Sequence, residues 1–138
     1  MREYVVTCCS TADMSRTFME TNEVPFAMFH YQLDGKEYAD DLYSSISPEV
    51  FYKMIGDGAQ PVTSQVNVEA YCALFEPVLK SGKDVLHLTL SSGISGSINS
   101  ANVAKTQMEE KYPDRRVMVV DSLAAVSYTH LTLPTNSL

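Results

Sequence analysis

Residues Leu88–Lys105 read LTLSSGISGSINSANVAK, and this stretch decides the fold. An apolar run ends at Leu90, and serines and glycines follow before a helical pattern begins. This order indicates a strand, a tight turn and a helix, whose first backbone N–H groups lack partners within the helix. Because the helix dipole also favours negative charge there, the junction is typical of a site that binds an anion.

Several sharper motifs are absent from this junction. Neither the Gly-Lys-Ser/Thr of a Walker loop nor the GxGxxG of a dinucleotide site occurs. The nucleophile elbow GxSxG is incomplete, because residues 93–97 read GISGS. A hydrolase would also require a histidine, and we interpret His87 as a core residue inside a strand. The serines therefore indicate a binding site without catalytic residues; an esterase or small-molecule phosphotransferase that uses Ser95 is the alternative.

Four segments have the composition of strands. Residues 24–33 read as one strand. Asp34-Gly35, a dipeptide favoured in hairpin turns, follows this strand. The other three are residues 3–8, 84–90 and 116–120. Helical patterns separate the later strands, and this alternation predicts right-handed βαβ units and an α/β fold with a doubly wound sheet.

Helices are expected after three start signals. Ser47-Pro48 supplies an N-cap and a proline at the first helical position, and Asn67 can cap a second helix. Pro77 should bend or interrupt that second helix. A third helix should run from the serine-rich loop to about Tyr112, where Pro113 stops it.

Composition excludes several classes of protein. The length of 138 residues fits one domain, and the net charge of −7 at pH 7 argues against a nucleic-acid or anionic-membrane surface. No apolar run approaches the roughly 20 residues of a membrane helix, and the start MREYVV lacks a signal peptide. Three cysteines without a CxxC pair indicate buried thiols and no disulfide framework or zinc site. We therefore expect a cytoplasmic protein without a metal or cofactor.

Small polar residues follow three of the expected strands. These clusters are residues 9–11, 91–97 and 121–122. In a doubly wound sheet, ligands bind beyond the carboxyl ends of the strands. A fourth cluster, Thr63–Gln65 (TSQ), precedes a helix. We expect all four clusters to lie together.

The ordered motifs resemble those of the DegV family of bacterial fatty-acid-binding proteins. The pattern of TSQ, then SSGxSG, then a strand that ends in Asp-Ser is specific, whereas any one motif alone would be weak. Cys9 departs from the family, which usually has Asp at this position. The matching segments are STAD at 10–13, VPF at 24–26, GKEY at 35–38, DD at 40–41, TSQ at 63–65, SSGISGS at 91–97 and VVDS at 119–122.

The resemblance implies a three-layer α/β/α sandwich with a largely parallel sheet, covered on one side by a second domain. It also implies that a long-chain fatty acid is buried between the domains. Thr63 and Ser95 would hold its carboxylate, with Ser64, Ser92 and Gly96 as additional candidates. Family members resembling this chain are not enzymes by themselves. They present the fatty acid to a separate kinase subunit, which converts the carboxylate to an acyl phosphate.

The resemblance also divides the chain. Residues 1–125 match the N-terminal DegV domain, and a complete member is about twice this length because it has two domains. Residues 126–138 read VSYTHLTLPTNSL, with no helical pattern. We expect this tail to be foreign or disordered, and the protein to be truncated. We also expect the isolated chain to bind fatty acid weakly, because part of the cavity wall would be missing.

Overall fold

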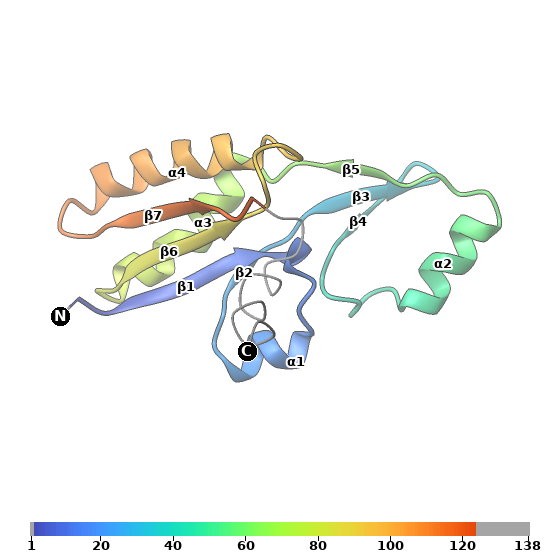
Figure 1. Cartoon of the computed structure of the whole chain (residues 1–138), viewed down its shortest axis with the longest axis horizontal. Coiled ribbons are helices and arrows are strands. Elements are labelled where there is room, and N and C mark those ends of the chain that lie inside the picture. Colours follow the sequence, from blue (N-terminus) through green and yellow to red (C-terminus); the bar gives the residue numbers. More distant parts are fainter. Residues whose placement is uncertain (1, 124–138) are drawn as a thin grey trace, which may run out of the picture.

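The computed structural model describes residues 2–123 and contains two sheets (Figure 1). The first sheet has the order β2-β1-β6-β7, and all its pairs are parallel. Its strands are β1 (Tyr4–Cys9), β2 (Phe26–Ala27), β6 (Asp84–Thr89) and β7 (Val117–Asp121). The prediction of an α/β fold with a largely parallel sheet is confirmed. The predicted tail at residues 126–138 lies outside the described residues.

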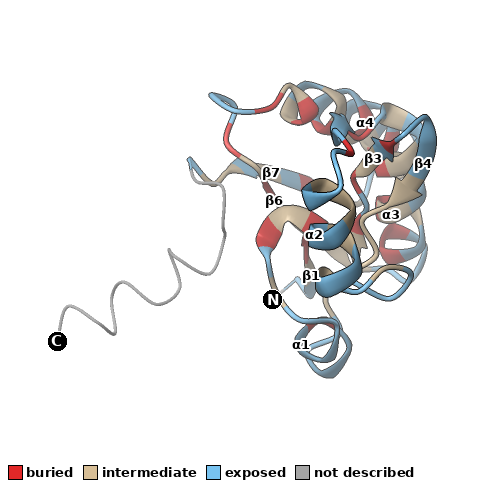
Figure 2. Cartoon of the chain, turned by 90° about the vertical axis from the view of Figure 1, so that its right-hand side faces the viewer, coloured by how far each residue is buried: buried red, intermediate tan, exposed pale blue. Residues whose placement is uncertain are grey.

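Helices α3 (Val68–Lys80) and α4 (Ser97–Lys111) cover one face of the parallel sheet. Alternate residues of β6, beginning with Val85, are buried on this face. They meet Tyr71 and Phe75 of α3, both 0% exposed, and Ala101 of α4. Figure 2 shows buried residues gathered on α3, α4 and the sheet, whereas exposed residues predominate on α1 and α2. The core therefore lies between the sheet and the α3–α4 pair.

The opposite face of the sheet carries a thinner layer. Helix α1 (Arg16–Thr21) buries Met19 against Cys8 and Leu42. A short 3₁₀ turn, η1 (Ser10–Ala12), precedes it. Further along this face, Met118 is 59% exposed. The three layers of the described residues are thus α3 with α4, the parallel sheet, and α1.

The prediction of one strand over residues 24–33 is wrong. The segment divides into β2 and β3 (His30–Leu33), which belong to different sheets. Between them Phe29 is buried, and its backbone N–H donates to Ser10 Oγ at 3.1 Å. A continuous apolar run does not reveal which strand will pair with each of its parts, and here the two parts have different partners.

The second sheet is antiparallel and has the order β4-β3-β5. Its hairpin joins β3 to β4 (Lys36–Ala39) through Asp34 and Gly35, both with positive φ, as a primed turn requires. Strand β5 (Val62–Ser64), which the sequence did not predict, pairs with β3. Helix α2 (Pro48–Gly56) packs Phe51 against Tyr31, with ring centroids 5.5 Å apart.

The predicted helix starts are confirmed. Ser47 Oγ accepts the N–H of Val50 at 3.4 Å, and Asn67 Oδ1 accepts that of Ala70 at 2.8 Å. Helix α3 nevertheless continues through Pro77 to Lys80, so the prediction of an interruption there is wrong. Pro77 lies in the last turn, where the missing N–H removes only one bond near the end of the helix.

Candidate ligand-binding site

The predicted polar clusters meet beyond the carboxyl end of the parallel sheet. Ser92 N–H donates to both carboxylate oxygens of Asp121, at 3.2 and 3.3 Å, and this joins the serine-rich loop to the end of β7. Ser10 and Thr11 line a cavity together with Ile94 of the same loop. The convergence expected from the sequence is therefore confirmed for these clusters.

A hydrogen bond from the Ser92 side chain is the main cause that holds the pKa of Asp121 below its usual value, so this carboxyl group is charged at neutral pH. The N–H of Leu123 adds to the same effect. Of the predicted site residues, Ser92 is exposed, but its backbone N–H is already bonded to this carboxylate. Asp121 therefore holds the loop in place, as a cap does.

The TSQ segment reaches the serine-rich loop through its last residue. Val66 N–H, directly after TSQ, donates to Ser97 Oγ at 3.3 Å. The Gln65 side-chain amide lies against Gly96, where a Cβ would be only 2.9 Å from Gln65 Oε1. A Cβ at Gly96 would therefore force the Gln65 side chain to shift.

The two residues predicted to hold a carboxylate differ in their surroundings. Ser95 is 9% exposed, and its hydroxyl donates to Ser97 Oγ at 3.0 Å and accepts Ser97 N–H at 3.2 Å. Thr63 is exposed on β5, opposite Tyr31 of β3, and lines a cavity. Ser64 Oγ donates to the backbone oxygen of His30 at 3.3 Å, so it supports the strand pairing.

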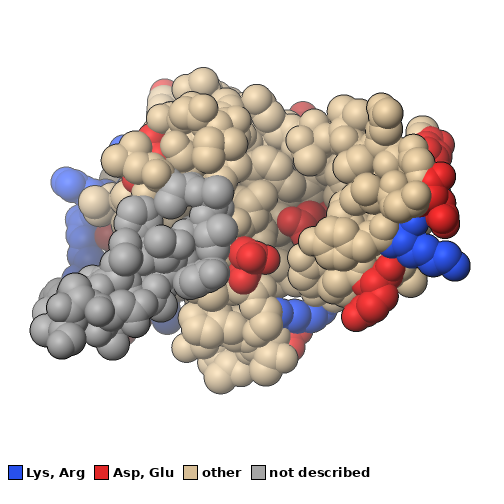
Figure 3. Space-filling view, turned by 45° about the vertical axis from the view of Figure 1, so that its right-hand side comes forward, with Lys and Arg blue, Asp and Glu red and all other residues tan. Residues whose placement is uncertain are grey.

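Two adjoining cavities run between the sheets. The first, about 310 Å³, is lined by Thr63 and by aromatic rings of β3 and α2. The second, about 340 Å³, reaches Leu90 and Ile94 at the serine-rich loop. Both are lined by Thr11, Asp40 and Tyr43, so together they form one hollow. Figure 3 shows a hollowed, largely uncharged surface with acidic groups beside it.

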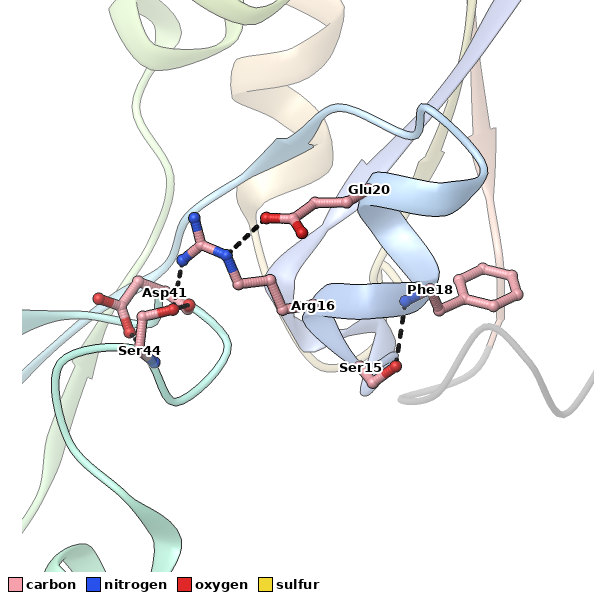
Figure 4. A network of polar contacts seen from close by, with 6 residues as sticks. All are labelled: Ser15, Arg16, Phe18, Glu20, Asp41 and Ser44. Atoms are coloured by element: carbon pink, nitrogen blue, oxygen red, sulfur yellow. Dashed lines mark hydrogen bonds and ion pairs between the residues drawn. The ribbon is translucent and has the colours of Figure 1, made fainter.

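A polar network fixes the loop that lines both cavities (Figure 4). Arg16 of α1 pairs with Glu20 at 2.7 Å and donates to Ser44 Oγ. Asp41 Oδ1 accepts the N–H of Ser44 at 2.9 Å. Between these two residues, Tyr43 has a φ of 65°, a left-handed conformation that is unfavourable for a bulky residue. The network therefore holds Tyr43 against a local backbone preference.

A second set of polar side chains lies inside the core, and Cys9 belongs to it. Cys9 is 2% exposed, and its Sγ lies 3.5 Å from Tyr71 Oη and 3.8 Å from His87 Nε2. His87 Nδ1 lies 2.8 Å from Thr7 Oγ1. Burial lowers the pKa of His87 to about 3, and burial raises that of Cys9. Both groups are therefore neutral, which confirms that His87 is a core residue.

The described contacts of His87 do not include Ser95. Its side-chain partners are Thr7 and Cys9, and its ring packs against Tyr71 and Phe75. The esterase alternative therefore gains no general base from this histidine. Within residues 2–123, no three His, Cys, Asp or Glu side chains are grouped as metal ligands. In the same range, no helix has the length and apolar character needed to cross a bilayer.

The sequence profile of the family described as uncharacterised proteins of the DegV family matches residues 5–133. This chain belongs to the DegV family. A DegV domain-containing protein of Clostridium perfringens is 34% identical over 125 residues, which is 91% of this chain and 43% of that protein. The DegV resemblance inferred from the motifs is therefore confirmed.

Solved DegV-type structures share the fold. A stearic acid-binding protein from Eubacterium ventriosum superposes with a TM-score of 0.82 at 29% identity, over 96% of this chain and 46% of that one. A fatty-acid-binding DegV protein from Thermus thermophilus gives 0.80 at 26% identity, over 98% and 46%. The fatty acid kinase B3 protein of Streptococcus pneumoniae, loaded with linoleic acid, gives 0.71 at 20%, over 96% and 46%. The chain thus spans less than half the length of these proteins.

Sequence reasoning missed most of the cavity wall. Tyr31, Tyr43 and Phe51 come from three separate elements or loops and surround the first cavity. Aromatic residues at these positions gave a weak signal, because such side chains are equally common in an ordinary core. Ser97 was also missed as a partner of TSQ, although it belongs to the quoted serine-rich loop.

Proposed function

We propose that the protein binds a long-chain fatty acid in the hollow between its two sheets. The observation that carries this proposal is the pair of adjoining cavities, the first lined by Thr63 and the second by Ile94 of the serine-rich loop. Two solved relatives, a stearic acid-binding protein and a fatty-acid-binding DegV protein, agree with it. An aromatic-walled hollow that also carries the hydroxyl residues Thr11 and Thr63 suits an acyl chain with a carboxylate head.

Thr63 and Ser95 are proposed to bind the carboxylate. A hydrogen bond to a charged acceptor contributes about 1.5–3 kcal/mol. A chain of about 14 methylenes contributes up to ~11 kcal/mol at about 0.8 kcal/mol each, before ordering costs. The acyl chain should therefore dominate affinity, whereas the two hydroxyl groups fix the position of the head group.

The rest of the proposal concerns the complete protein. Because the DegV relatives are more than twice as long, we infer that the complete gene product supplies further walls of the cavity. The proposed role is to present the bound acid in the cytoplasm to a separate kinase subunit, which phosphorylates the carboxylate. This role rests on the family resemblance of the TSQ and SSGxSG motifs.

The proposal is tested with the complete gene product purified from cells. Mass spectrometry of the extracted lipid should find a C14–C18 fatty acid, and added oleate should raise the melting temperature. Absence of lipid together with an unchanged melting temperature would refute fatty-acid binding.

The head-group assignment requires a variant. Thr63→Val combined with Ser95→Ala should weaken oleate binding and transfer to the kinase, because both donors are lost. Ser100→Ala, in α4 directly after the serine-rich loop, is the control and should behave as wild type. Wild-type binding and transfer in the double variant would remove both residues from the site.

A further inference from the structure

Ser97 lies where the TSQ segment meets the serine-rich loop. We propose that Ser97 is a positioning residue: it holds the segment that carries Thr63 in a fixed place relative to Ser95, and so sets the affinity for a carboxylate. This rests on the fatty-acid function proposed above. Ser97 is the first residue of α4 and is only 1% exposed, so water does not compete for its hydroxyl group.

Both lone pairs of the Ser97 hydroxyl oxygen are used. A serine hydroxyl has one hydrogen and two lone pairs. Its oxygen accepts Val66 N–H at 3.3 Å and Ser95 O–H at 3.0 Å. Since Ser97 is 1% exposed and its oxygen accepts both bonds, its side chain has little freedom to rotate.

The bond to Val66 fixes the course of the TSQ segment. Val66 is 2% exposed in the core between the sheet and the helices, so its N–H would be buried without a partner if Ser97 Oγ were removed. Thr63 lies three residues earlier, on β5. The amide of Gln65 against Gly96 is a second contact between the same segments. These contacts determine where the chain leaves the antiparallel sheet.

The bonds between Ser97 and Ser95 fix the position of Ser95, the second residue proposed to bind the carboxylate. Ser97 N–H donates to Ser95 Oγ, which holds that oxygen in place whether or not its own hydrogen is engaged. A bound carboxylate would take the Ser95 hydrogen in exchange for Ser97 Oγ, while the N–H bond stays. Ser97 therefore keeps the Ser95 oxygen in position. The Ser95 hydroxyl hydrogen can then turn to a ligand while the backbone stays in place.

The test compares oleate with methyl oleate, which has the same chain but no negative charge, in the complete gene product. Ser97→Ala should weaken oleate binding about five- to tenfold and methyl oleate binding less than about twofold, because only the charged head uses the fixed geometry. Ser97→Thr, which keeps the hydroxyl, should retain most of the preference for oleate. Ser100→Ala is the control and should match wild type.

A second measurement separates this inference from the proposed function. In the ligand-free 138-residue chain, Ser97→Ala should speed hydrogen exchange of the Val66 amide by about tenfold or more. Unchanged exchange, or an equal loss of both ligands, would overturn the role of Ser97. If wild type binds neither ligand, the fatty-acid proposal fails. The exchange result still shows whether Ser97 protects the Val66 amide.

Should Ser97→Ala fail to fold, Gly96→Ala replaces it. The added methyl group would overlap the Gln65 amide and displace this side chain from its contact with the loop, without removing any hydroxyl group. The same selective loss of oleate binding is expected. Equal affinities of Gly96→Ala and wild type for oleate would contradict the requirement for close contact between the two segments.

Discussion

Replacing His87 with glutamine should remove most of the acid sensitivity of this fold between pH 7 and pH 5. The imidazole is 0% exposed, lies 2.8 Å from Thr7 Oγ1 and packs against the rings of Tyr71 and Phe75. Burial lowers its pKa from 6.5 to about 3, because no nearby acid compensates the protonated form. In the pH range where the unfolded chain protonates this histidine, the native state therefore keeps it neutral.

The sign and size follow from proton linkage. Below pH 6.5 the unfolded chain binds one more proton than the native state at this site, so stability falls as the pH drops from about 6.5 towards 3. The slope in this window is about 1.4 kcal/mol per pH unit. Integrated from pH 7 to pH 5, His87 alone should lower the free energy of unfolding by about 2 kcal/mol.

The assay is urea unfolding at pH 7 and at pH 5, followed by circular dichroism. Wild type should lose about 2 kcal/mol more than His87→Gln between the two pH values. His30→Gln, a matched change at the half-buried His30 of β3, is the control for the substitution itself. Equal losses in wild type and His87→Gln would refute the linkage argument, whatever the absolute stability of the variant.

Three further outcomes can be checked on the same chain. Thiol labelling of the native protein should modify the half-buried Cys72 first and Cys9 only on unfolding, because Cys9 is 2% exposed and burial raises its pKa; equal rates would contradict this. Phe75→Ala should lower the free energy of unfolding by about 3–5 kcal/mol in urea melts. Phe18 is 41% exposed, so Phe18→Ala should lower it by less than about 1 kcal/mol. Asn67→Ala should remove the α3 cap and lower the free energy of unfolding by about 1 kcal/mol. An unchanged free energy of unfolding would show that the 2.8 Å bond is not needed.

The sequence predicted the elements whose causes are local. The Asn67 cap, the Asp34-Gly35 turn and the strand-turn-helix at residues 88–105 depend on neighbours within a few positions, and the structure confirms them. Strand β5 escaped prediction, because three exposed residues, Val62–Ser64, form a strand only by pairing with β3. The single strand expected over residues 24–33 failed for the same reason, since its parts pair with different strands.

By itself, the sequence determined the family, the parallel sheet and the polar character of its carboxyl edge. These follow from residue order, because periodicity and turn residues act along the chain. Tertiary structure alone decided that Val66 bonds to Ser97 and that Tyr43 lies between two cavities. Such contacts join residues far apart along the chain, 31 positions in the case of Val66 and Ser97. Their geometry depends on how the core packs, and no local pattern of residues encodes it.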